Sequence, residues 1–127
     1  MKKQIERLKS LERIARMKSD LEMRRFSAFR ANVSAAQGRI AALHAELQDL
    51  YDSPAVFTIA EARLANALAQ EGVTALRAEE MGLERMMPGF EAARAAAVRE
   101  FGRADVLRRL RDGMIAKREK AAEKARQ

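Results

Sequence analysis

The side chains that most enzymes use for catalysis are scarce in this sequence of 127 residues. It has no cysteine and one histidine, His44, which stands two residues before Glu46. A histidine beside a carboxylate can act as a general base, but no serine stands at a spacing suited to the matching nucleophile. We therefore interpret His44 as a surface residue, and the sequence predicts no catalytic residue and no enzymatic activity.

Motifs that bind metals or cofactors are also missing. The Glu-x-x-His spacing of helical metal sites does not occur, and neighbouring acids such as Glu79 and Glu80 are typical of a solvated helix surface. The glycines stand singly, so no glycine-rich phosphate-binding loop is formed. We interpret Met81, Met86 and Met87 as pliable core packing. The sequence thus predicts no metal, no cofactor and no small-molecule substrate.

The first feature that indicates binding is a cluster of large apolar residues between positions 47 and 59. It includes Leu50, Tyr51, Val56 and Phe57, which are too many for the end of a two-helix turn to enclose. Exposed apolar patches on a protein surface usually mark contact sites. We predict that these residues bind a partner; the alternative is that they plug the end of the turn.

A second candidate binding segment lies near the carboxyl end. Its apolar residues recur at helical spacing, and cations surround them. The segment comprises Leu107, Arg108, Arg109, Leu110, Met114, Lys117 and Arg118. A basic amphipathic helix is typical of an element that docks on an acidic or anionic surface. The alternative is a solvated, fraying terminus.

Two long helices must position these segments. The composition, 48% hydrophobic and 34% charged with 5% aromatic residues, is typical of long helices and argues against a β-sandwich or barrel. From Phe26 to Leu50, apolar residues recur at alternating steps of three and four, the heptad pattern of a coiled coil. The same frame extends upstream to Ile5, but four apolar residues fall outside it. They are Leu11, Ile14, Met17 and Leu21, and we predict a local stutter there.

The first break in the helical pattern falls within residues 51–58. Either Ser53-Pro54 or the capping-box spacing from Thr58 to Glu61 would start a second helix. We predict an all-α fold consisting of one antiparallel two-helix coiled-coil hairpin over residues 1–127. Helix one covers about 2–51, the turn about 52–57, and the longer helix two about 58–124, with a kink near Pro88-Gly89.

The expected register pairs positions whose numbers sum to 109, because most of the paired layers are then apolar on both sides. It sets Val33 opposite Leu76, places Gly38 nearly level with Gly72, and buries Phe101. Ser19 and Glu22 fall opposite the Pro88-Gly89 irregularity. About 19 residues at the carboxyl end would then project beyond the hairpin.

The net charge of +7 is distributed in blocks along the chain. Residues 1–30 carry +6 and residues 103–127 carry +5, whereas residues 31–52 and 53–102 carry −2 each. A hairpin brings the two basic blocks together. Nucleic-acid binding is therefore an alternative function, although burial of Phe101 argues against a base-stacking surface.

No apolar run reaches the roughly 20 residues that a membrane span needs, and the amino terminus is charged too early for a signal peptide. We expect a cytoplasmic protein that is not inserted in a membrane. Because a two-helix hairpin buries a single seam, we also expect it to need a partner or to form a homodimer.

Several of these features together resemble one known family. The chain starts with a basic segment containing Lys2, Lys3, Arg7 and Lys9, continues as a long helix, and turns into an alanine- and glutamate-rich second helix. It ends with Ala97-Val-Arg-Glu-Phe-Gly-Arg-Ala-Asp-Val-Leu-Arg-Arg-Leu110 and a Lys/Arg/Glu tail. This layout resembles the FliJ family, the coiled-coil stalk of flagellar export, which is related to the YscO-type proteins of type III secretion.

The resemblance implies a non-enzymatic stalk or adaptor in a protein-export apparatus. Its implied partners are the export ATPase ring, the export gate protein and export chaperones, at a location peripheral to the inner membrane. The termini with Arg108, Arg109, Lys117 and Arg118 would face the ATPase, and the cluster around Tyr51 and Phe57 another component; the opposite polarity stays open. The alternative is a basic coiled-coil protein that binds nucleic acid or another helical partner.

Overall fold

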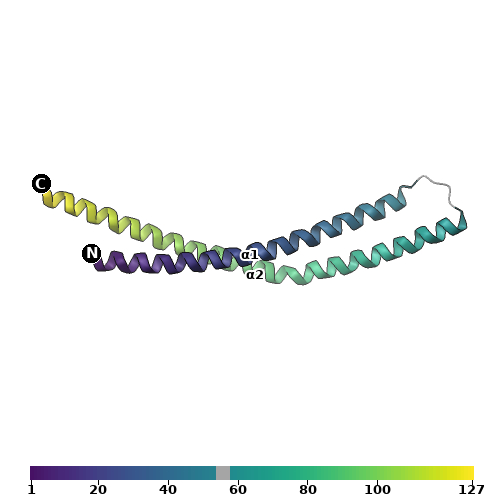
Figure 1. The fold of residues 1–127 in the computed structure, drawn as a ribbon, viewed down its shortest axis with the longest axis horizontal. Helices are drawn as coiled ribbons and strands as arrows, with labels where there is room; N and C mark the ends of the chain where they lie inside the picture. The colour runs from purple at the N-terminus through teal and green to yellow at the C-terminus, as the bar shows by residue number, and fades with distance from the viewer. Residues whose placement is uncertain (54–57) are drawn as a thin grey trace. The chain divides into compact units, whose positions relative to one another are not determined.

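A computed structural model describes residues 1–53 and 58–127 of the chain. It contains two helices, α1 over Lys2–Tyr51 and α2 over Ile59–Arg126, and no strand occurs in these ranges. The helices run antiparallel and pack together (Figure 1). The predicted all-α hairpin is confirmed, and the predicted helix bounds are right to within two residues.

The second helix, as described, starts at the capping box predicted from Thr58 to Glu61. The Glu61 backbone N–H donates to Thr58 Oγ1 at 3.2 Å, and the Thr58 N–H donates to Glu61 Oε2 at 3.4 Å. These two reciprocal bonds satisfy backbone donors that a helix amino terminus otherwise leaves without partners. The other predicted start, at Pro54, and the binding residues Val56 and Phe57 lie outside the described residues.

Helix α2 continues without interruption through Pro88. Proline lacks the N–H that would bond to the carbonyl one turn earlier, so this position carries a local cost within the helix. The helix does not end there, and the predicted kink stays a prediction.

The chain forms two compact units, which we name by what they contain. The terminal unit consists of residues 1–27 and 91–127 and holds both chain ends; the turn unit consists of residues 28–90. Each unit contains one stretch of α1 and one stretch of α2. The terminal unit has 20 basic and 10 acidic residues, and the turn unit 5 and 8, so their net charges are +10 and −3.

Helix α1 turns one unbroken heptad frame toward α2. From Ile5 to Leu50, every position of the predicted frame is buried or half-buried. The frame positions in the terminal unit include Glu12 and Ser19, each 5% exposed. The four large apolar residues outside the frame, by contrast, are 52–63% exposed: Leu11, Ile14, Met17 and Leu21. The predicted stutter is therefore wrong, because the frame is kept even where it buries polar side chains.

The predicted register is wrong by about ten residues in the turn unit. A Cβ placed on Gly72 would lie 2.9 Å from Leu47 Cδ2, and one on Gly89 would lie 2.8 Å from Phe29 Cε1. The position numbers in these pairs sum to 119 and 118, not to 109. The predicted approach of Gly38 to Gly72 does not occur, since a Cβ at Gly38 would meet no atom within 4 Å.

The terminal unit follows the same shifted register. Arg111 Nη1 lies 3.2 Å from Glu12 Oε2, and Leu107 lines one groove with Leu11. Contrary to the prediction, Ser19 and Glu22 do not lie opposite Pro88-Gly89 in this register, because the pairing is shifted by about ten residues along α2. The segment containing Leu107 and Met114 packs beside α1, so about nine residues, rather than 19, extend past the start of α1. Phe101, predicted to be buried, is 61% exposed, and Met81, interpreted from the sequence as core packing, is 53% exposed.

Candidate protein-interaction surfaces

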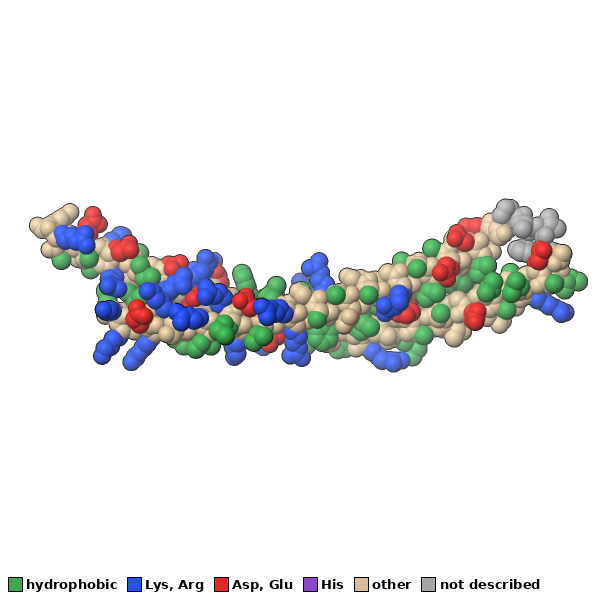
Figure 2. Space-filling view, in the orientation of Figure 1, with side chains coloured by type: hydrophobic (Ala, Val, Ile, Leu, Met, Phe, Trp, Pro, Cys, Tyr) green, Lys and Arg blue, Asp and Glu red, His purple; other side chains and the backbone are tan. Residues whose placement is uncertain are grey.

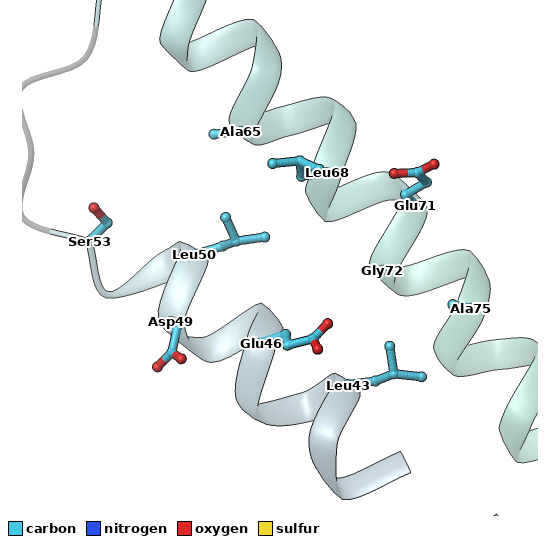
Figure 3. A pocket seen from close by; sticks show the side chains of 10 residues that line it. All are labelled: Leu43, Glu46, Asp49, Leu50, Ser53, Ala65, Leu68, Glu71, Gly72 and Ala75. Carbon is cyan, nitrogen blue, oxygen red and sulfur yellow. The ribbon is translucent and has the colours of Figure 1, made fainter. Parts of the chain in front are cut away.

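The turn unit carries an apolar groove between its two helices (Figure 3). Leu43 and Leu50 point from α1 toward α2, Leu68 points back from α2, and Gly72 belongs to the lining. Three acidic side chains line the same groove, and they are Glu46, Asp49 and Glu71. The groove thus combines an apolar floor with an acidic edge.

The structure divides the predicted cluster at the turn. Leu50 is half-buried and lines the groove, whereas Tyr51 is 70% exposed. At the start of α2, Ile59 and Leu64 are also exposed. Exposed apolar surface is therefore present in this part of the turn unit, as predicted from the sequence.

A second apolar groove lies between the helices of the terminal unit. Leu11, Ile14 and Ala15 line it from α1, and Val106 and Leu107 line it from α2. Its polar lining consists of Lys18, Glu100 and Arg103. Among the residues predicted to bind a partner, Leu107 belongs to this groove. Leu110 is half exposed, and Met114 is half-buried.

Two of the predicted binding cations are already paired within the chain. Arg108 Nη2 lies 2.7 Å from Asp105 Oδ1, and Arg109 Nη2 lies 3.0 Å from Asp105 Oδ2. The hydrogen bond from Arg108 lowers the pKa of Asp105 below its ordinary value, and Asp105 in turn raises the pKa of Arg108. Lys117 and Arg118 are exposed and form no ion pair with another described residue. Of the four predicted cations, these two are therefore the most available to a partner.

The seam of the terminal unit buries acidic side chains. Glu12 is paired with Arg111 of α2, and Glu100 accepts a hydrogen bond from Arg103 at 2.9 Å. Glu22 Oε2 is buried without a hydrogen-bond partner. Buried carboxylates need such pairing because desolvation costs several kcal/mol per ion, so this seam stabilises the hairpin less than an apolar one would.

Exposure of Phe101 removes one argument against nucleic-acid binding. Its ring shares a shallow hollow with Arg16 and Arg108, which are cations that could contact phosphates. However, Asp20 and Asp105 line the same hollow, and their charges repel a phosphate backbone.

The structure does not test the prediction that the chain has no catalytic residue. His44 Nε2 lies 3.8 Å from Glu80 Oε1, and both side chains are more than half exposed. Over residues 1–53 and 58–127, no three potential metal-ligating side chains gather. In the same ranges, no helix has an apolar stretch long enough to cross a membrane.

Lysine and arginine side chains gather over the part of the chain that carries both termini (Figure 2). This follows from the net charge of +10 in the terminal unit, and it agrees with the charge blocks in the sequence. Sequence reasoning missed the terminal-unit groove itself. The available signal was the set of apolar residues outside the heptad frame, which we interpreted as a stutter and not as a second apolar face.

Comparison with known proteins gives no assignment. No protein-family model, no curated protein and no solved structure matches the chain significantly.

Proposed function

We propose that the chain is a non-enzymatic helical-hairpin adaptor or stalk of a flagellar, type III-type protein export apparatus. In this role it contacts the export ATPase ring and either the export gate or export chaperones. The observation that supports this proposal is the pairing of strongly unequal charge with apolar surface on both units. One unit carries +10 and the other −3, and each has an apolar groove between its helices. Such a molecule can hold different partners at different places without chemistry of its own.

Pull-down of a purified export ATPase by the full chain tests this proposal. The first variant reverses three exposed cations of the terminal unit, Lys117→Glu, Arg118→Glu and Lys120→Glu. The matched control reverses three exposed cations of the turn unit, Arg63→Glu, Arg77→Glu and Arg85→Glu, so that both variants change the net charge equally. We expect the ATPase to bind the wild type and the control, and the first variant to lose about tenfold or more in affinity.

The second candidate function is binding of nucleic acid, which the exposed ring of Phe101 beside Arg16 favours. The measurement is the salt dependence of binding to duplex and single-stranded DNA. Release of counterions would give a steep loss of affinity with salt. Tight DNA binding that depends on Phe101, together with no ATPase binding, would replace the export role by this one.

A further inference from the structure

We propose that the groove of the terminal unit binds an acidic amphipathic helix of a partner protein. The lining residues are Leu11, Ile14 and Ala15 from α1 and Val106 and Leu107 from α2, with Lys18 and Arg103 at the edge. This inference goes beyond the export role and does not depend on it, because it concerns the chemistry of the groove alone.

The distribution of apolar residues on α1 indicates that the groove is covered by another molecule. In the terminal unit, the seam facing α2 holds Glu12 and Ser19, while Leu11, Ile14 and Leu21 lie on an adjacent face more than half exposed. Burial of leucine and isoleucine side chains is favourable, whereas burial of a carboxylate is costly. Folding of the chain alone leaves these leucine and isoleucine side chains exposed and so does not gain this stabilisation. A helix of another molecule that lay in the groove would bury them.

The exposed residues have the spacing of a second helix-packing stripe. Positions 11, 14, 18 and 21 follow steps of three, four and three, and the residues are Leu11, Ile14, Lys18 and Leu21. On α2, Val106 lies in the same groove, and Leu110 follows one turn later. This stripe runs parallel to the seam, so a third helix placed between the two stripes would complete a three-helix bundle.

The charge of the groove selects an acidic occupant. Lys18 has no ion pair with another described residue, and the unit as a whole carries +10. The acid in the lining, Glu100, is already compensated by Arg103 at 2.9 Å and Arg99 at 3.7 Å. A second copy of this unit would bring one +10 surface against another, and like charges at a close interface oppose association. A helix with glutamate or aspartate flanking its apolar stripe would be attracted.

The concave shape favours a helix over a lipid surface. Gly102 lies in the lining without a side chain, and a Cβ built on it would meet no atom within 4 Å, so the α2 side leaves open space there. A membrane surface takes up apolar side chains that protrude, whereas a recess between two helices accepts the ridge of another helix.

A fluorescently labelled peptide is the probe for this proposal. It spans three heptads, about 21 residues or roughly 30 Å, with leucine at positions a and d and glutamate at e and g. One control peptide has the same composition with the leucines shuffled out of register, and another has lysine in place of glutamate. Fluorescence anisotropy with the full chain should show binding of the first peptide and at least about tenfold weaker binding of both controls.

Variants of the full chain locate the binding site. Ile14→Ser with Val106→Ser should weaken binding of the acidic peptide about tenfold, since both side chains line the groove. The matched control is Leu64→Ser with Met81→Ser, which removes two exposed apolar residues of the turn unit and should leave binding unchanged. Lys18→Glu should weaken binding, whereas Lys120→Glu, an exposed cation of the same unit outside the groove, should change it little.

Four outcomes would overturn the proposal. The first is equal binding of the peptide by the groove variant and its control, and the second is equal binding of the acidic and lysine peptides. The third is a dimer in sedimentation that Ile14→Ser with Val106→Ser disperses, because the occupant would then be a second copy. The last is binding to vesicles of anionic lipid through these residues without any binding of the peptide. Circular dichroism of each variant confirms that the helices are retained.

Discussion

At the scale of single residues, the glycines of α2 differ in what surrounds them. A side chain at Gly72 or Gly89 would approach Leu47 or Phe29 closer than 3.0 Å. A side chain at Gly82 would meet no atom within 4 Å. Glycine in a helix interior costs about 1 kcal/mol relative to alanine, so at Gly72 and Gly89 this cost is offset by close packing of the two helices.

Replacing these glycines by alanine should therefore have opposite effects. Gly82→Ala should raise the free energy of unfolding by about 1 kcal/mol through helix propensity alone. Gly89→Ala should lose that gain or destabilise the protein, because the ring of Phe29 must move by several tenths of an ångström. Urea unfolding followed by circular dichroism measures both.

Phe29→Leu provides the control for the Gly89 effect. It removes the ring atoms that the new methyl group would meet, so Gly89→Ala should then be stabilising relative to Phe29→Leu alone. Equal effects of Gly82→Ala and Gly89→Ala in the wild-type background would contradict the packing of Phe29 on Gly89.

The pairing of Asp105 with two arginines predicts a dependence on pH. The hydrogen bond from Arg108 lowers the pKa of Asp105 in the folded protein. A carboxyl with a lowered folded-state pKa contributes stability above its unfolded-state pKa of about 3.9, and that contribution is lost as the pH falls through the folded-state pKa. NMR titration should give a midpoint for Asp105 below that of an unstructured aspartate.

Arg108→Gln tests the assigned cause of this shift. The midpoint of Asp105 should rise toward its ordinary value, and any loss of thermal stability should be seen at pH 7 and vanish as the pH falls through the folded-state pKa of Asp105. A midpoint unchanged by the substitution would assign the effect to Arg109, whose Nη2 lies 3.0 Å from the other carboxylate oxygen.

At the scale of the helices, the α1 stretch of the terminal unit turns polar side chains toward α2 and large apolar side chains toward solvent. Glu22 lies in the frame that faces α2 and has a buried oxygen without a partner, whereas the adjacent Leu21 is 63% exposed. Glu22→Leu should therefore stabilise the hairpin by about 1–3 kcal/mol, the cost of leaving a buried polar group unsatisfied. Leu21→Ser should change the free energy of unfolding by less than about 0.5 kcal/mol. Thermal and urea unfolding compare the two.

Asp20→Leu serves as the control for the added leucine, because position 20 is exposed and lies outside the frame. It should have little effect on stability. If Leu21→Ser were the strongly destabilising change and Glu22→Leu were not stabilising, the face toward α2 would have to be the one that carries Leu21.

The register of the helices predicts which cysteine pairs can form a disulfide bond. The native sequence has no cysteine, so introduced pairs have no competing thiol. Leu47→Cys with Gly72→Cys should oxidise readily, since a Cβ at position 72 lies against the side chain of Leu47. Leu47→Cys with Ala62→Cys, the pairing in which position numbers sum to 109, should stay reduced. Mobility on non-reducing gels distinguishes the two, and the reverse result would restore the register predicted from the sequence.

The sequence predicts the elements of this fold better than their alignment. The heptad frame of α1 and the capping box at Thr58 are local patterns, and both are confirmed. The register is not local. Helix α2 is rich in alanine, so it offers small apolar residues to α1 in several registers, and composition does not distinguish among them. The pairing of apolar layers was the criterion for the expected register, and α2 instead begins about nine residues beyond the level of Tyr51.

The interaction surfaces were predictable from the sequence only where they depend on local patterns and not on the register of the two helices. Exposure of Tyr51 follows from the number of apolar residues near the turn, which the sequence displays. The groove at Leu11 and Val106 depends on the register, because residues about 95 positions apart must meet. The ion pairs of Arg108 and Arg109 with Asp105 are local helix pairs at spacings of three and four, so the sequence contained the signal that these cations are partly neutralised.

At the scale of the whole molecule, the unequal charges of the two units predict an unequal response to salt. The terminal unit carries +10 and the turn unit −3, so self-repulsion destabilises the terminal unit more. Raising the ionic strength from about 0.01 M to about 1 M shortens the screening length from about 30 Å to about 3 Å and removes most of this repulsion. Amide hydrogen exchange in residues 1–27 and 91–127 should then slow markedly, while exchange in residues 28–90 changes little. Mass spectrometry of peptides from each unit measures this within one sample, so a general effect of salt on exchange cancels. Equal slowing in both units would show that the cations of the terminal unit are neutralised within the folded chain, and it would remove the electrostatic basis for an acidic partner at its groove.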